Sequence, residues 1–135
     1  MRNPLEITVE ELFDLEEMTD ENKARFICEL PNDYELKEED VDGVGVVVGE
    51  FYKQLNEFID SLKGLKVSIS ETRSPEMEMF SQMYQRQSNL SAVAKENNCS
   101  WNDVLKMSVY MYYAVLDFVA YRNYAEYKDF KFRNK

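Results

Sequence analysis

The chain has 135 residues, the length of one domain, and this is enough to bury a core without disulfides or metals. Hydrophobic residues make up 44% of it, with only 4 Gly and 3 Pro, which excludes a disordered protein and argues against a turn-rich all-β fold. The net charge of −10 is uneven: residues 1–50 hold 16 acidic and 4 basic residues, whereas the basic tail from Arg122 onward carries +3. An acidic surface repels nucleic acid and membranes, so neither is a predicted partner.

The sequence offers little material for catalysis or metal binding. It contains no His, and its two cysteines, Cys28 and Cys99, form no CxxC pair, so reduced buried thiols are expected rather than a zinc site. A calcium loop starting at Asp40 would need Glu at its twelfth position, where Phe51 stands. Asp117 falls within the apolar last helix but on the side away from its apolar face. We therefore predict a non-enzymatic protein with no catalytic residue, cofactor or metal.

No part of the sequence predicts a membrane segment or a leader. The longest apolar region, Val109 to Val119, is interrupted by Asp117 and is too short to span a bilayer. The first residues contain no apolar stretch typical of a signal peptide. A cytoplasmic location is therefore expected.

Two short helices are predicted at the start of the chain. Thr8 and Glu11 have the spacing of a capping box, which begins a helix over about residues 8–18. Thr19 begins a second helix, which Pro31 ends. A strand over residues 24–30 is an alternative to this second helix.

A polar, acidic loop with one helical turn is expected over residues 32–42, and a longer helix follows. The 3–4 spacing of apolar residues from Val44 to Leu62 predicts five helical turns, with Gly64 at the C-cap position. Gly45 and Gly49 weaken this helix unless another helix packs closely against them. Residues 65–72 alternate apolar and polar side chains and predict one short extended segment.

The C-terminal half begins at Ser74-Pro75, a cap followed by proline at the first helical position. The helix is predicted to reach about Gln87. Four of its side chains are expected to face inward: Met79, Phe80, Met83 and Tyr84. A short helix at residues 90–97 follows, and a capping box of Ser100 with Asp103 begins the longest helix, Trp101–Tyr127, whose apolar stripe extends from Val104 to Val119.

A helix-turn-helix-like corner is predicted near residues 90–107. Ala94, Asn98 and Val104 stand at the spacing of the small residue, the left-handed turn residue and the buried aliphatic residue of that motif. A DNA reader needs basic and amide side chains on the second helix, where Asp103 stands in a chain of net charge −10. A structural corner is therefore favoured over DNA binding.

The aromatic and methionine residues of this half suggest a protein-binding surface. One helix face cannot hold all the tyrosines of the last helix, and exposed Tyr and Met have interface composition. Half-buried tyrosines that cover a small core are an alternative. The candidate partner-binding residues are Trp101, Tyr113, Tyr121, Tyr124, Tyr127, Met77 and Met79.

The segment over residues 92–107 carries a family resemblance. It contains a small residue, a turn and the run Ser-Trp-Asn-Asp-Val-Leu-Lys-Met, and it stands between a polar helix and a long aromatic helix. This arrangement resembles the C-terminal helical region of tail assembly chaperones of long-tailed bacteriophages. The likeness covers about residues 76–127. It implies an acidic, mostly helical protein of the host-cell cytoplasm that acts in virion assembly. Such a protein binds a long hydrophobic helical client, the tape-measure protein, or another phage structural protein, and keeps it soluble.

Together these patterns predict an all-α fold, a small bundle of about five to six helices in a single domain. Its acidic N-terminal part covers residues 1–64, a linker residues 65–73, and its C-terminal helical part residues 74–135. The expected function is protein interaction or assembly, with a protein partner and room for homo-oligomers. The alternatives are an acidic inhibitor that mimics nucleic acid in the basic groove of an enzyme, and a helix-turn-helix DNA-binding protein.

Overall fold

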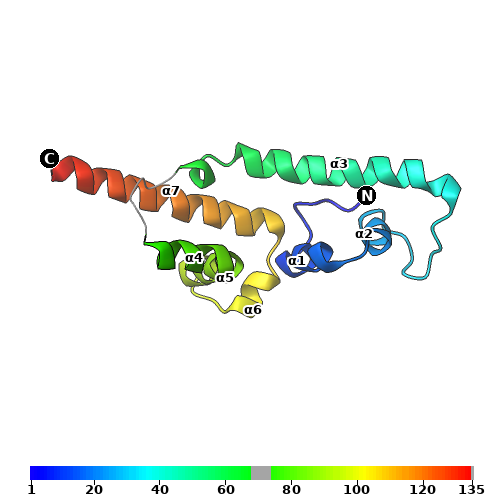
Figure 1. Cartoon of the computed structure of the whole chain (residues 1–135), viewed down its shortest axis with the longest axis horizontal. Coiled ribbons are helices and arrows are strands. Elements are labelled where there is room, and N and C mark those ends of the chain that lie inside the picture. The colour runs from blue at the N-terminus through cyan, green and yellow to red at the C-terminus, as the bar shows by residue number, and fades with distance from the viewer. Residues whose placement is uncertain (68–73, 135) are drawn as a thin grey trace. The chain divides into compact units, whose positions relative to one another are not determined.

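The structure, a computed structural model, describes residues 1–67 and 74–134 (Figure 1). Throughout that part the chain is all-α, as predicted. Its elements are α1 (Val9–Glu17), α2 (Asp20–Ile27), η1 (Glu38–Asp40), α3 (Val41–Ser61), η2 (Gly64–Lys66), α4 (Pro75–Met83), α5 (Gln85–Glu96), α6 (Trp101–Leu105) and α7 (Val109–Arg133), where η denotes a short 3-10 helix. Of the extended segment predicted over residues 65–72, the start belongs to η2 and residues 68–72 lie outside the described residues.

The chain divides into two compact units. Unit 1 is made of Met1–Ser61 together with Lys106–Tyr110. Unit 2 contains the described residues within Leu62–Leu105 and Met111–Lys135. The chain thus returns to unit 1 for five residues before it completes unit 2.

The starts of α1 and α2 are capped as predicted. The backbone N–H of Glu11 donates to Thr8 Oγ1 at 3.1 Å, and the N–H of Thr8 donates back to Glu11 Oε1 at 2.9 Å. Thr19 Oγ1 accepts from the N–H of Asn22 at 3.2 Å. These side chains satisfy amide groups that have no partner inside a helix.

The end of α2 differs from the prediction, because Pro31 does not end it. The helix stops at Ile27, and Glu29 adopts the left-handed conformation with φ 59°. The N–H of Leu30 then donates to the Arg25 carbonyl at 2.9 Å, and that of Glu29 donates to the Phe26 carbonyl at 3.3 Å. This is the Schellman pattern, formed here without the glycine that usually signals it.

The helix α3 begins at Val41, three residues earlier than the spacing predicts, because η1 leads directly into it. Phe51, at its middle, and Leu55, one turn later, are buried. No atom lies within 4 Å of a Cβ built on Gly45 or Gly49, so the close helix packing that would explain these glycines is absent from the described part of the chain.

The last piece of unit 1 comes from far along the sequence. Thr8 and Ser108 form an antiparallel bridge, and the N–H of Val109 donates to the Ile7 carbonyl at 2.8 Å. The N–H of Val9 donates to the Met107 carbonyl at 2.9 Å. Ile7, Val9 and Val109 are all buried, so this pairing is part of the core of unit 1.

This pairing explains why the predicted helix Trp101–Tyr127 is not continuous. It divides into α6 and α7, because residues 106–108 leave the helix to pair with the segment around Thr8. The break raises the number of α-helices among the described residues to seven, above the predicted five to six.

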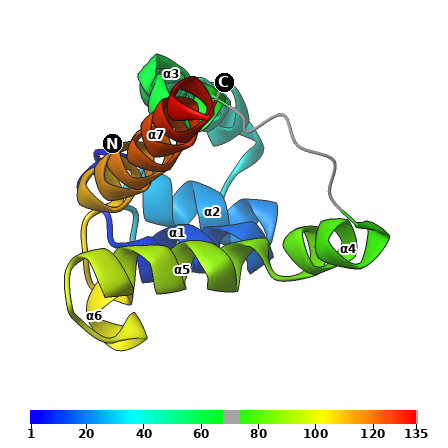
Figure 2. The same ribbon diagram turned by 90° about the vertical axis from the view of Figure 1, so that its left-hand side faces the viewer.

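The predicted helix-turn-helix-like corner is present in unit 2, between α5 and α6 (Figure 2). Asn98 takes the left-handed conformation with φ 52°, while Ala94 and Val104 are buried. The N–H of Cys99 donates to the Ala94 carbonyl at 2.9 Å, and that of Asn98 donates to the Lys95 carbonyl at 3.3 Å. The corner is therefore a second Schellman motif, with asparagine where glycine is common.

Gly64 does not act as the predicted C-cap of α3, which ends at Ser61. It lies in η2, where its N–H donates to Asp117 Oδ1 at 2.6 Å. A Cβ on Gly64 would overlap the backbone carbonyl oxygen of Asp117. Asp117, predicted to point away from the apolar face of the last helix, thus holds η2 close to α7 within unit 2.

None of the helices in residues 1–67 and 74–134 is both long enough and apolar enough to cross a membrane.

Candidate protein-interaction surface

The apolar side chains of α4 are exposed, which is the main disagreement with the sequence-based prediction. Met79, Phe80 and Met83, predicted to face inward with Tyr84, are 62%, 51% and 62% exposed. No residue of α4 is buried. The predicted start is correct, since Ser74 Oγ accepts from the N–H of Met77 at 3.2 Å.

The reason for this exposure lies in the length of α4. The helix ends at Met83 after nine residues, and α5 begins at Gln85, so the predicted continuation to Gln87 belongs to another helix. At the end of α4 the rings of Phe80 and Tyr84, the residue between the two helices, are 5.2 Å apart. The rest of α4 therefore keeps its apolar side chains in solvent.

A concavity of about 670 Å³ lies where α4, α5 and the start of α6 meet. Phe80, Tyr84 and Trp101 provide its aromatic lining, and Ala92 adds to the apolar area. Its polar lining residues are Gln87, Ser88, Ser91 and Lys95. Trp101 is 47% exposed, and its indole Nε1–H donates to Ser91 Oγ at 3.2 Å, which fixes the ring at the edge of the concavity.

The N-terminal part of α7 within unit 2 has a buried tyrosine rather than an exposed strip. Tyr112 is 2% exposed, and burial raises its pKa to about 12. Leu116 is buried one turn later. Tyr113, a predicted partner-binding residue, is half-buried and makes an edge-on contact with Tyr112 at 5.2 Å between ring centroids.

The other predicted tyrosines lie further along α7. Tyr121 is exposed, whereas Tyr124 and Tyr127 are half-buried. Lys128 Nζ lies 5.5 Å from the centre of the Tyr124 ring, and Lys131 Nζ lies 5.6 Å from that of Tyr127. This end of α7 therefore combines aromatic and cationic side chains.

An ion pair joins the end of α5 to α7. Both guanidinium Nη atoms of Arg122 donate to Glu96, at 2.8 and 2.9 Å. This bidentate pair lowers the pKa of Glu96 and raises that of Arg122. Arg122 also lies over the ring of Phe118 at 5.3 Å, so it is held in place and has little freedom to contact a partner.

The structure brings some of the predicted partner-binding residues near one another and separates the rest. Trp101 shares the concavity with Phe80 and Tyr84, which were predicted to be core residues. Met77 and Met79 lie on α4, exposed but outside the lining of the concavity. The four tyrosines lie on α7 and do not line it. Exposed aromatic residues that the prediction missed are Phe80, Tyr84, Tyr110, Phe118, Phe130 and Phe132.

In the described part of the chain, no group of three or more Cys, Asp or Glu side chains is placed to hold a metal ion. No family model, no curated protein and no solved structure matches this chain.

Proposed function

We propose that this chain is a non-enzymatic interaction protein that binds an apolar helical client, as a phage tail assembly chaperone does. The proposed binding surface consists of the exposed methionines of α4 together with the concavity at Trp101. Met79 and Met83 lie on one side of the helix, and Met77 lies about 200° around it from Met79. The tail-chaperone resemblance of residues 92–107 supports this assignment, because its Trp101 lies in that concavity.

The observation that carries the proposal is that no residue of α4 is buried. A helix of nine residues is marginal in water, since isolated helices need about 12–15 residues even with favourable composition. Most helical stability in proteins comes from packing an apolar face. The apolar face of α4 therefore needs a cover, and flexible methionine side chains adapt to varied helical partners.

The experiment is an affinity pull-down of the tagged chain from its native lysate, with washes at low and high salt. The test variant replaces Met77, Met79 and Met83 with Gln, which keeps side-chain length and helix propensity but removes the apolar surface. Met111→Gln is the control, because Met111 is also an exposed methionine, at 47%, but belongs to α7. Circular dichroism checks that both variants keep their helix content.

We expect the wild-type chain and Met111→Gln to retain a long helical protein through the high-salt wash. The triple variant should fail to retain it. Equal recovery with the triple variant would contradict the assignment of α4. Recovery of a nucleic-acid enzyme that is released by high salt would instead support the acidic-inhibitor alternative, which depends on the charge of residues 1–50.

DNA binding is the weaker alternative. The second helix of the corner, α6, has only five residues. Asp103 lies on it and accepts from the N–H of Ser100 at 3.1 Å in the predicted capping box. A carboxylate at this position repels phosphate, and phosphate contacts dominate DNA affinity.

A further inference from the structure

Unit 1 contains an apolar groove between α2, α3 and the loop before η1. Its volume is about 290 Å³, and six residues form its apolar lining: Ala24, Leu36, Val41, Val44, Gly45 and Val48. This groove is separate from the α4 surface proposed above, which belongs to unit 2.

Unit 1 itself leaves this groove open. Val41 is 61% exposed, and Leu36, Val44 and Val48 are only half-buried. Gly45 contributes no side chain, and a Cβ built there has no atom within 4 Å. The open volume is enough for one large side chain of a partner.

The surroundings of the groove are acidic. Asp20 and Glu21 line one side, with Lys23 as the single cation in the lining. The acidic turn η1 comes directly before Val41. Within it, the N–H of Lys37 and the hydroxyl of Tyr34 both donate to Asp40 and lower the pKa of that carboxyl. A partner for this groove should therefore present an apolar side chain beside positive charges.

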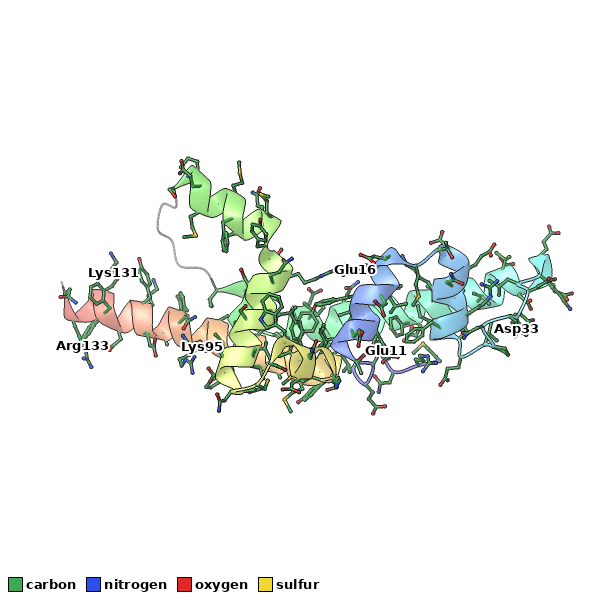
Figure 3. The ribbon with its side chains drawn as sticks, turned by 90° about the horizontal axis from the view of Figure 1, so that it is seen from below. Glu11, Glu16, Asp33, Lys95, Lys131 and Arg133 are labelled. Carbon is green, nitrogen blue, oxygen red and sulfur yellow. The ribbon has the colours of Figure 1, made fainter. Side chains whose placement is uncertain are left out.

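The C-terminal end of α7 has that composition. Phe132 is 70% exposed, and from Arg122 onward the chain carries a net charge of +3, in contrast to −12 for residues 1–50. Lys128 lies one turn before Phe132 on the same side of the helix, and Lys131 and Arg133 flank it. Figure 3 shows Lys131 and Arg133 at this end of α7, with their side chains directed away from the helix.

We propose that the groove of unit 1 binds the end of α7 from a second copy of the chain. Phe132 enters the apolar groove beside Gly45, and the neighbouring lysines, Lys128 and Lys131, face Asp20. Glu21 already pairs with Arg25 at 3.6 Å, and Arg133 pairs with Asp129 at 3.2 Å. Each copy then offers one groove and one helix end, so the contact is heterologous, joining different surfaces of the two copies. Association is concentration-dependent and weakens as salt screens the charges.

The test is sedimentation velocity of the full chain from about 1 to about 200 μM, at about 50 and 500 mM salt. Two variants remove opposite sides of the contact. Gly45→Leu fills the groove from a position where the chain's own atoms leave space, and Phe132→Ala removes the inserted ring. Each should weaken self-association about tenfold or more, the usual effect of losing one buried large apolar side chain.

Each variant has a matched control. Gly49→Leu changes a glycine of the same helix that also has free space around it but does not line the groove. Phe130→Ala removes a ring of similar exposure, 61%, that lies about 200° around the helix from Phe132. Both controls should associate like the wild type.

Mixing the two disabled variants gives the sharpest result. The Gly45→Leu chain keeps its helix end and the Phe132→Ala chain keeps its groove, so an equimolar mixture should form a dimer at concentrations where neither variant associates alone. A wild-type chain that stays monomeric at every concentration overturns the proposal. So does a mixture that fails to associate while both variants keep wild-type circular dichroism, or a Phe130→Ala variant that is weakened as much as Phe132→Ala.

Discussion

Replacing Gly64 by alanine tests whether η2 lies against α7 as described. The added Cβ would overlap the Asp117 carbonyl oxygen and would lie 2.6 Å from Asp117 Oδ1 and 3.0 Å from the carbonyl carbon. Two of these neighbours are backbone atoms of a helix, which cannot move aside by changing a rotamer. The substitution must therefore displace η2 and break the hydrogen bond from Gly64 N–H to Asp117 Oδ1.

The expected loss of unfolding free energy is about 2.5–6 kcal/mol. A hydrogen bond to a charged group contributes about 1.5–3 kcal/mol, and overpacking adds about 1–3 kcal/mol. Gly43→Ala and Gly49→Ala are controls in which the unfolding free energy should change in the opposite direction, because no atom lies within 4 Å of a Cβ at either position. Each should raise the stability of α3 by up to about 1 kcal/mol through helix propensity.

Urea unfolding followed by Trp101 fluorescence measures this prediction. Trp101 is the single tryptophan of the chain and belongs to unit 2, as does Gly64. Far-UV circular dichroism follows the helices of both units in the same samples. A Gly64→Ala chain that unfolds within about 0.5 kcal/mol of the wild type, which is the usual scatter of neutral surface substitutions, would refute the contact.

Three further predictions concern unit 2. Asn98→Val should destabilise the α5–α6 corner by about 1–2 kcal/mol, because β-branched residues disfavour the left-handed conformation, while Asn98→Gly should be neutral or slightly stabilising. Urea unfolding followed by Trp101 fluorescence compares the two variants. Equal free energies of unfolding would contradict the φ of 52° at Asn98. In an alkaline absorbance titration one tyrosine should ionise near pH 12, and this ionisation should be absent from the Tyr112→Phe variant. Because this pKa is raised above the ordinary value of 10, the stability it contributes is complete below pH 10 and is lost as the pH rises toward 12. In Arg122→Gln the pKa of Glu96 should rise toward its ordinary value of 4.5, as read from the NMR titration of its carboxyl carbon; an unchanged pKa would mean that the bidentate pair does not form in solution.

Local signals in the sequence predicted the helix starts well. The hydroxyl caps Thr8, Thr19 and Ser74 each accept the expected hydrogen bond, because capping involves residues only three positions apart. The turn at Asn98 was also predictable, since its small and aliphatic neighbours stand at the spacing of a known corner.

Long-range contacts caused the errors. Nothing near residue 107 in the sequence reveals that its carbonyl accepts from Val9, and this pairing divides the predicted helix into α6 and α7. The glycine Gly64 looks like a helix cap unless its contact with Asp117, 53 residues later, is known. Periodicity similarly placed Met79 and Met83 in a core, because a stripe of apolar residues does not tell whether the chain supplies the surface that covers it.

The pairing of residues 5–9 with residues 107–110 has a consequence for the order of folding. During synthesis, α1, α2 and α3 leave the ribosome long before Val109, yet Val109 is 0% exposed beside the start of α1. Unit 1 therefore cannot close its core until Val109, 48 residues after the end of α3 at Ser61, has been made, unlike a domain that folds as soon as its own segment emerges. Until then Ile7 and Val9 have no permanent cover, so the nascent chain has an extended period in which chaperones and proteases can act on it.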